Sequence, residues 1–189
     1  ETAAQPAKKA DYTPLRKLVV DGRVHIDKLK VKNARVQDID LKISGRNGFL
    51  NLDPLSMRLY EGDMKSKATL DVRGNTPTTN VSLQMNGVEV RPLLKDLKDK
   101  DFLEGNMHVQ MVLAMKGDTG KKIKQTLNGK GKFSLNDGAI VGIDLAAMAR
   151  NVKSAFGLGV KGGQRPRTDF AELNAPFTLT NGLFETPNT

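Results

Sequence analysis

Apolar and polar residues alternate along most of this chain with the period of two that is typical of β-strands. The clearest run has an apolar side chain at every second position from 107 to 115. Because successive side chains of a strand point to opposite faces, these residues are predicted to share the concave or core face, with His108, Gln110 and Val112 opposite. The five residues are Met107, Val109, Met111, Leu113 and Met115.

Shorter alternating runs predict further strands before and after this one. Val24/Ile26 and Leu29/Val31 are out of phase by one residue, and the same shift separates Val36 from Ile39/Leu41/Ile43. Each phase change predicts a bulge, which bends and twists a sheet. The remaining predicted strands cover 49–52, 55–60, 64–72, 81–90, 133–135, 139–143, 177–179 and 183–184.

Glycine preceded by Asp, Asn or Glu recurs eight times between these runs. Asn-Gly and Asp-Gly supply the positive φ of tight hairpin turns, so this punctuation predicts an antiparallel meander. The pairs are Asp21-Gly22, Asn47-Gly48, Glu61-Gly62, Asn86-Gly87, Glu104-Gly105, Asn128-Gly129, Asp137-Gly138 and Asn181-Gly182.

Three segments have helical spacing instead. Pro92 begins a short predicted helix with an apolar side at 93–97, and Thr119 caps another that Gly129 ends. Residues 144–156 predict an amphipathic helix that packs over the apolar side of the sheet, or over one end of it, as a lid or cap. The apolar positions of this lid are Leu145, Met148, Val152 and Phe156.

Together these patterns predict a mainly β protein, a curved antiparallel sheet or groove built of loose repeats, with one amphipathic helix and one or two short helices. The predicted divisions are a linker at 1–12, a first β block at 13–99, a second β block with the helix at 100–156, a flexible basic loop at 157–168 and terminal strands at 169–189.

Charge narrows the possible partners. The 189 residues carry a net charge of +9 and contain no Cys, which excludes disulfides and thiolate metal sites. A basic chain favours an anionic partner, either nucleic acid or a lipid surface. The lysines alternate with apolar residues along strands, and with no Trp and two Tyr the chain has few stacking groups. We therefore expect no nucleic-acid partner and interpret the lysines as solvating the outer face, where they also suit an anionic membrane surface.

Residues suited to catalysis or metal binding do not converge. His25 and His108 stand apart from each other and from any further ligand, so both are interpreted as exposed strand residues. The glycine-rich run at 157–162 follows a predicted helix, whereas a dinucleotide-binding loop follows a strand. No enzyme activity, cofactor or metal is expected.

Several runs in the second half resemble the C-terminal region of the AsmA family of bacterial envelope proteins. Residues 127–131 match its Leu-x-Gly signal, and 133–145 match its strand, Asp-Gly-Ala turn and Gly-x-Asp-Leu helix start. Residues 168–170 and 177–182 resemble the segment that follows. Residues 59–62 resemble the family's Tyr-Gly-Gly turn, with Glu61 in place of the first Gly.

The resemblance implies the periplasmic part of a longer, inner-membrane-anchored protein, from which this chain is expected to be a segment. Members of the family form β grooves with an apolar interior and are implicated in phospholipid transport and outer-membrane homeostasis. The expected partners are therefore a phospholipid or other envelope lipid and, in addition, other envelope proteins.

The predicted helices are too few to cover the predicted strands, so part of the apolar face is expected to accept lipid. The alternative is a structural or protein-interaction domain that closes over itself and holds no lipid. The lipid-contacting candidates are the five residues at 107–115 together with Leu70, Leu83, Met85, Phe133 and Leu135.

Overall fold

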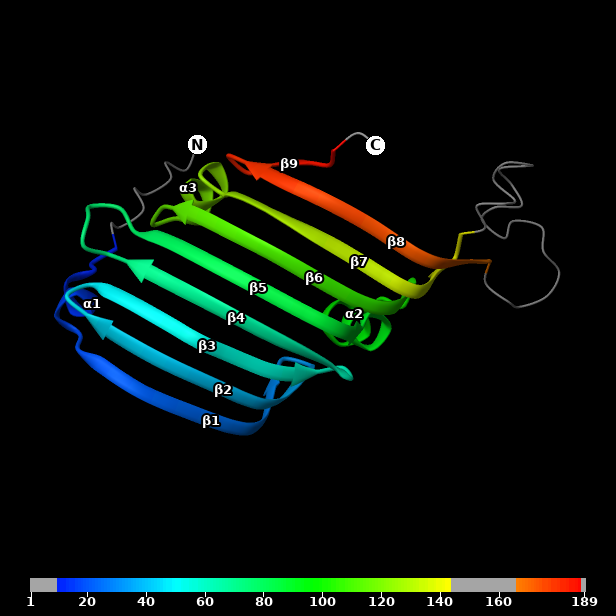
Figure 1. Cartoon of the computed structure of the whole chain (residues 1–189), viewed down its shortest axis with the longest axis horizontal. Coiled ribbons are helices and arrows are strands. Elements are labelled where there is room, and N and C mark those ends of the chain that lie inside the picture. Colours follow the sequence, from blue (N-terminus) through cyan, green and yellow to red (C-terminus); the bar gives the residue numbers. More distant parts are fainter. Residues whose placement is uncertain (1–9, 144–165, 188–189) are drawn as a thin grey trace, which may run out of the picture.

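A computed structural model describes residues 10–143 and 166–187 of the chain. These residues form one nine-stranded antiparallel sheet in which each strand pairs with its neighbours in sequence (Figure 1). The strands are β1 (Val20–Val31), β2 (Ala34–Arg46), β3 (Phe49–Leu59), β4 (Gly62–Asp71), β5 (Thr78–Glu89), β6 (Leu103–Lys116), β7 (Asn128–Val141), β8 (Arg167–Thr180) and β9 (Leu183–Glu185). Since β1 and β9 stand at opposite edges, the sheet is open, and the predicted fold class is confirmed.

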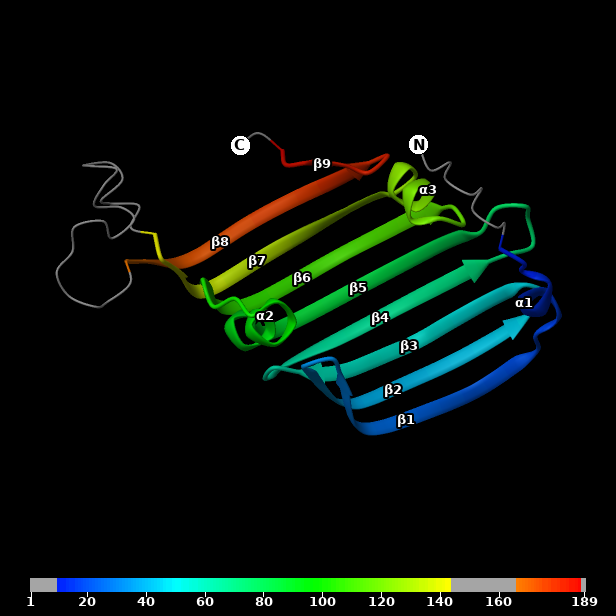
Figure 2. The ribbon, with the colours of Figure 1, turned by 180° about the vertical axis from the view of Figure 1, so that it is seen from behind.

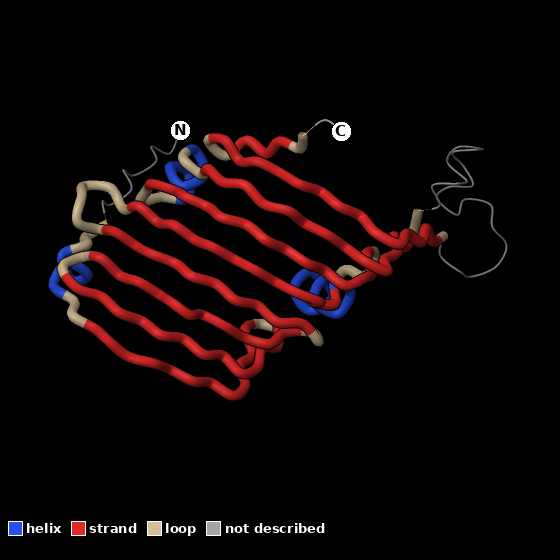
Figure 3. The backbone as a smooth tube through the Cα atoms, viewed as in Figure 1, coloured by secondary structure: helices blue, strands red, loops and turns tan. Residues whose placement is uncertain are grey.

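The described residues form three short helices, which lie near the ends of the strands (Figure 3). They are α1 (Thr13–Lys17), α2 (Val90–Lys98) and α3 (Gly120–Gln125). Helix α2 begins two residues before Pro92, which the first turn tolerates because its N–H groups lack intrahelical acceptors. The predicted cap of α3 is confirmed, since Thr119 Oγ1 accepts a hydrogen bond from the Lys122 N–H at 3.3 Å.

One helix prediction differs from the structure, and another falls outside the described residues. Helix α3 ends at Gln125 and not at Gly129, which lies in β7. The reason is Thr126, whose Oγ1 accepts from the Lys116 N–H at 2.8 Å and so holds the chain against the end of β6. The amphipathic helix predicted at 144–156 lies outside the described residues, as does most of the predicted loop, although Arg167 and Thr168 belong to β8.

The eight glycine pairs serve two purposes, of which only one was predicted. Asn47-Gly48 and Asn181-Gly182 form hairpin turns with positive φ at both residues, and a third turn falls at Tyr60-Glu61, one residue before its predicted place. The other five pairs lie inside strands, where the turn prediction is wrong. Gly87 and Gly105 adopt positive φ at register shifts, because a bulge needs the same backbone freedom as a turn.

A bulge explains one of the two phase changes. The predicted bulge after Val36 is confirmed by the positive φ of Asp38 and by a register shift between β2 and β3. The register between β1 and β2 has no shift, so the phase change after Ile26 is not caused by a bulge between these two strands. The apolar positions of both strands change face at the same place. Strand β3 continues through Pro54, where two strands were predicted, because Pro54 lies at a bulge and interrupts no regular ladder.

Cross-strand pairing gives the sheet two unlike faces, since paired residues lie on the same side. One row of paired residues crosses every strand and contains no polar side chain. This row defines the apolar face and consists of Gly22, Ile43, Leu52, Ala68, Val81, Leu113, Gly129, Leu179 and Phe184. The adjacent row defines the polar face and includes Ser44, Asn51, Thr69, Asn80, Ala114 and Asn128.

Most of the buried side chains lie at the ends of the apolar face, although Ile39, Leu50 and Ser66 are also buried, at 6–8% exposed. Val88, Leu135 and Ala139 are at most 1% exposed, and Val90, the first residue of α2, is 4% exposed. Helix α2 crosses the ends of β5 and β6 (Figure 2). At the other ends of the strands Val72 is also buried, and Arg16 of α1 donates to its carbonyl oxygen at 2.8 Å. Between these ends, no element of the described residues covers the apolar face.

Candidate apolar groove

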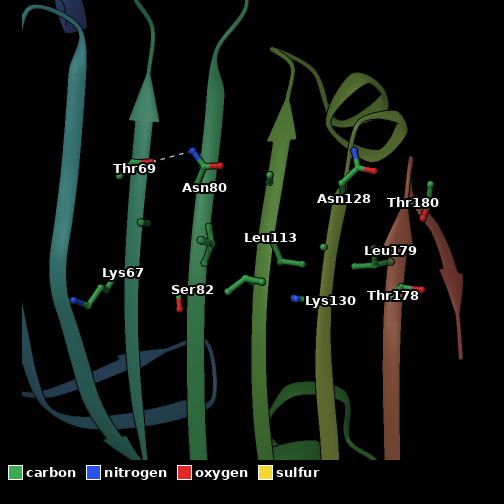
Figure 4. A pocket seen from close by; sticks show the side chains of 15 residues that line it. Lys67, Thr69, Asn80, Ser82, Leu113, Asn128, Lys130, Thr178, Leu179 and Thr180 are labelled. Carbon is green, nitrogen blue, oxygen red and sulfur yellow. Dashed lines mark hydrogen bonds between the residues drawn. The ribbon is translucent and has the colours of Figure 1, made fainter. Parts of the chain in front are cut away.

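A hollow of about 680 Å³ lies in the middle strands of the sheet, close to the strand ends beside α3. The residues lining it come from β4, β5, β6, β7 and β8 (Figure 4). Ala68, Val81, Leu113 and Leu179 form its apolar part, and each is paired with the next or joined through Gly129. The hollow is therefore part of the apolar row that crosses the sheet.

Gly129 of β7 lines this hollow, and Gly131 lies two residues further along the same strand. Leu113 and Leu179 point toward one another across β7 at Gly129 (Figure 4). A Cβ atom at Gly129 would lie 2.8 Å from Leu113 Cδ2 and still closer to the carbonyl oxygen of Val112. At Gly131 a Cβ would lie 2.6 Å from the Phe177 ring. Neighbouring side chains thus use the space that these glycines leave.

The predicted alternation along β6 is confirmed. Met111, Leu113 and Met115 are half-buried, whereas Gln110 and Val112 are exposed. His108 lies on the polar face opposite Ser134, where it is half-buried and not exposed as predicted. All the predicted lipid contacts in this strand consequently share the apolar face with their partners on β5.

The other predicted contacts divide into two groups. Leu70, Leu83, Met85 and Phe133 lie half-buried on the apolar face. Leu135 is only 1% exposed and belongs to the packed end beside α2, because Met107 and Leu173 flank it as cross-strand partners. The predicted lid residues Leu145, Met148, Val152 and Phe156 lie outside the described residues.

Sequence reasoning missed most of the residues that line the hollow. Ala68, Val81 and Leu179 belong to runs that were predicted as strands, but the candidates did not include them. Register decides which residues of different strands meet, and a single sequence does not reveal it. The signal at Gly129 and Gly131 was visible, because two glycines at alternate positions leave one face of a strand without side chains.

A side-chain network closes the opposite end of the apolar face. Tyr60, in the β3–β4 turn, donates its hydroxyl to Asp96 Oδ2 of α2 at 2.9 Å. Arg35, near the tip of the β1–β2 hairpin, donates its N–H to the Tyr60 hydroxyl at 3.4 Å and pairs with Asp96 at 3.5 Å. Burial and the bond to Asp96 raise the pKa of Tyr60 above its ordinary value of 10.0. Three elements distant in sequence are thus joined at this end.

The described residues form neither a cluster suited to binding a metal ion nor a helix suited to crossing a membrane. Within residues 10–143 and 166–187, no three His, Cys, Asp or Glu side chains lie close enough to hold a metal ion. His25 contacts Asp27 at 3.1 Å on the exposed edge strand β1. None of the helices in this part of the chain has the length and apolar character of a membrane span.

An open antiparallel sheet with one continuous apolar face defines a β-groove protein. The chain belongs to the AsmA family, whose family model matches residues 2–189. Membership of this family indicates a protein of the bacterial envelope. No curated protein and no solved structure matched the chain in our comparisons.

Proposed function

We propose that the apolar face accommodates the acyl chains of a phospholipid or other envelope lipid, for transport between membranes and outer-membrane homeostasis. The segment acts without catalysis, in the periplasmic part of a protein anchored in the inner membrane. Membership of the AsmA family supports this setting. The geometry of the sheet supports a lipid as the ligand.

The apolar row across all nine strands is the observation that carries this proposal. A sheet with one apolar face must cover it with another layer or with a ligand. The described helices cover only the strand ends, so the middle of the face remains available. Each methylene group that leaves water for such a surface gains about 0.8 kcal/mol.

The surface also suits a long flexible chain better than a rigid ligand. The hollow falls within the range of about 300–1,000 Å³ that is usual for small-molecule sites. All six methionines of the described residues lie on this face, and their unbranched side chains adapt to irregular apolar partners. They are Met57, Met64, Met85, Met107, Met111 and Met115.

Two neighbouring residues of β6 provide a matched test. Leu113→Asp places a charge in the hollow, whereas Val112→Asp places the same charge on the polar face, where Val112 is already 46% exposed. We expect native mass spectrometry to find phospholipid on the gently purified wild-type chain and on Val112→Asp. Leu113→Asp should lose most of it, because a carboxylate is costly to bury against acyl chains.

The alternative, a structural or protein-interaction domain of the envelope, predicts different results. It predicts no lipid on the wild-type chain and loss of the folded sheet in Leu113→Asp, which circular dichroism would detect. Equal lipid on both variants would also contradict the proposal, since the two changes differ only in the face that they alter.

A further inference from the structure

Positive charge gathers at the strand ends beside α1 and α3. The connecting segments at this end are 10–19, 46–49, 71–77, 116–127 and 180–183. They contain eight basic residues and three acidic ones. The basic residues are Arg16, Lys17, Arg46, Arg73, Lys116, Lys121, Lys122 and Lys124, and the acidic ones are Asp11, Asp71 and Asp118. We call this end the basic rim.

Several cations of the basic rim remain without an anionic partner. Asp71 pairs with Arg73 at 2.6 Å, and Asp118 pairs with Lys122 at 3.0 Å. Lys121 and Lys124 are exposed, form no ion pair within the described residues, and lie on one side of α3 because they are three residues apart. The acidic residues therefore neutralise other cations and leave this side of α3 positively charged.

The hollow of the apolar face lies at the same end of the strands. Its lining in β6 ends at Ala114, two residues before Lys116 and six before α3. Its lining in β7 begins at Asn128, three residues after α3 ends. Helix α3 thus stands directly beyond the edge of the hollow. The opposite ends of the strands are packed around Val88 and Leu135. The hollow at that end is smaller, about 360 Å³, and charged residues such as Arg35, Arg58 and Glu89 line it.

We propose that Lys121 and Lys124 bind the phosphate of an anionic phospholipid whose acyl chain occupies the hollow. This inference rests on the proposed function and adds a substrate class and an orientation to it. The headgroup lies at the basic rim, and the chain runs from there along the apolar row. A soluble anion would not account for the apolar surface that adjoins the lysines, whereas an amphiphile matches both parts.

Vesicles of two compositions test the proposal on the whole chain. Wild-type protein is incubated with phosphatidylglycerol or phosphatidylcholine vesicles and separated from them, and the lipid that it carries is measured. Lys121→Gln/Lys124→Gln removes two charges and preserves helix propensity. Lys65→Gln/Lys132→Gln removes the same charge from exposed positions on the polar face of β4 and β7 and serves as the control.

We expect wild type and the control pair to carry more phosphatidylglycerol than phosphatidylcholine. In Lys121→Gln/Lys124→Gln this preference should be roughly five- to thirtyfold lower, which is the change expected for one or two lysine contacts with an anionic headgroup. Its uptake of phosphatidylcholine should stay unchanged, because the hollow is intact.

Four results would overturn the inference. If wild type takes up both lipids equally, or if both double variants lose the preference equally, the basic rim does not bind the headgroup. The proposed apolar groove is not contradicted by either result. If soluble glycerol phosphate inhibits lipid uptake as strongly as competing lipid does, the ligand need not be an amphiphile and the inference fails. If wild type takes up neither lipid, the proposed function fails and the orientation fails with it.

Discussion

The hollow depends on the absence of a side chain at Gly129. Leu113 and Leu179 approach each other over this residue, and the backbone of Val112 leaves no room for a Cβ atom. Gly22 belongs to the same apolar row in β1, but nothing lies within 4 Å of the position that a Cβ would take there. Glycine is therefore required in β7 and merely tolerated in β1.

This difference predicts the effect of adding one methyl group. Gly129→Ala should lower the free energy of unfolding by about 1–3 kcal/mol, the usual cost of forcing extra volume into a packed site. Gly22→Ala should leave it unchanged or raise it by up to about 1 kcal/mol, because alanine restricts the unfolded chain. Urea unfolding of both variants measures the difference. Equal effects would show that Gly129 is not packed as described.

The Asp71 carboxylate offers a second test at this scale. The Arg73 side chain donates to both of its oxygens, at 3.0 and 2.6 Å, and together with the Arg73 N–H lowers the pKa of Asp71 from 3.8 to about 2. Because the folded-state pKa lies below the unfolded one, the contribution to stability is complete above about pH 4 and is lost as the pH falls toward 2.

Removing the guanidinium should reverse this shift. In Arg73→Gln we expect the pKa of Asp71 to rise toward 3.8, as measured by NMR titration of its carboxyl carbon. The pKa of Asp40, which Arg23 lowers on β1 and β2, is the internal control and should stay low. A pKa of Asp71 that remains near 2 would mean that the Arg73 side chain is not its main partner.

At the level of elements, the sequence predicted strands better than it predicted their connections. The alternation in β6 sufficed because strict period two has one structural meaning. The Asp137-Gly138 pair was misread as a turn, although Asp137 adopts the positive φ that such a pair favours, because β7 continues through it. Local chemistry specifies a backbone angle, whereas pairing with β6 and β8 decides whether the chain turns there or bulges.

The candidate site shows the same limit. The apolar face could be predicted strand by strand, because each strand carries its own alternation. The hollow could not, since it depends on which residues of β4 and β8 align with Leu113 and Gly129. The network of Tyr60, Asp96 and Arg35 also joins positions up to 61 residues apart, and no local pattern indicates it.

On the scale of the whole molecule, the two edges of the sheet are unlike. Strand β9 has three residues and pairs only with Thr178–Thr180. Strand β1 has twelve residues and no neighbour on its outer side within the described residues, and its Val24 and Val31 are 46% and 55% exposed. Such an edge invites pairing with another chain unless charges oppose it.

Lys28 and Lys30 supply charge at this edge. We expect Lys28→Val/Lys30→Val to self-associate at concentrations where wild type does not, because the change makes β1 more apolar and removes repulsion. Sedimentation velocity measures the association. Lys65→Val/Lys132→Val carries the same change on interior strands and should stay like wild type. If both variants associate equally, general loss of charge is responsible and the edge is not.

The row from Gly22 to Phe184 has a further consequence for an occupant of the kind proposed. Neighbouring strands are about 4.8 Å apart, so the row repeats one chemical environment at that interval across the sheet. A chain that shifts sideways by one strand leaves one apolar neighbour and meets another, and its free energy changes little. Away from the lysines of α3, such a surface would hold an apolar chain without fixing its lateral position, so that a chain not held by its headgroup could diffuse from strand to strand.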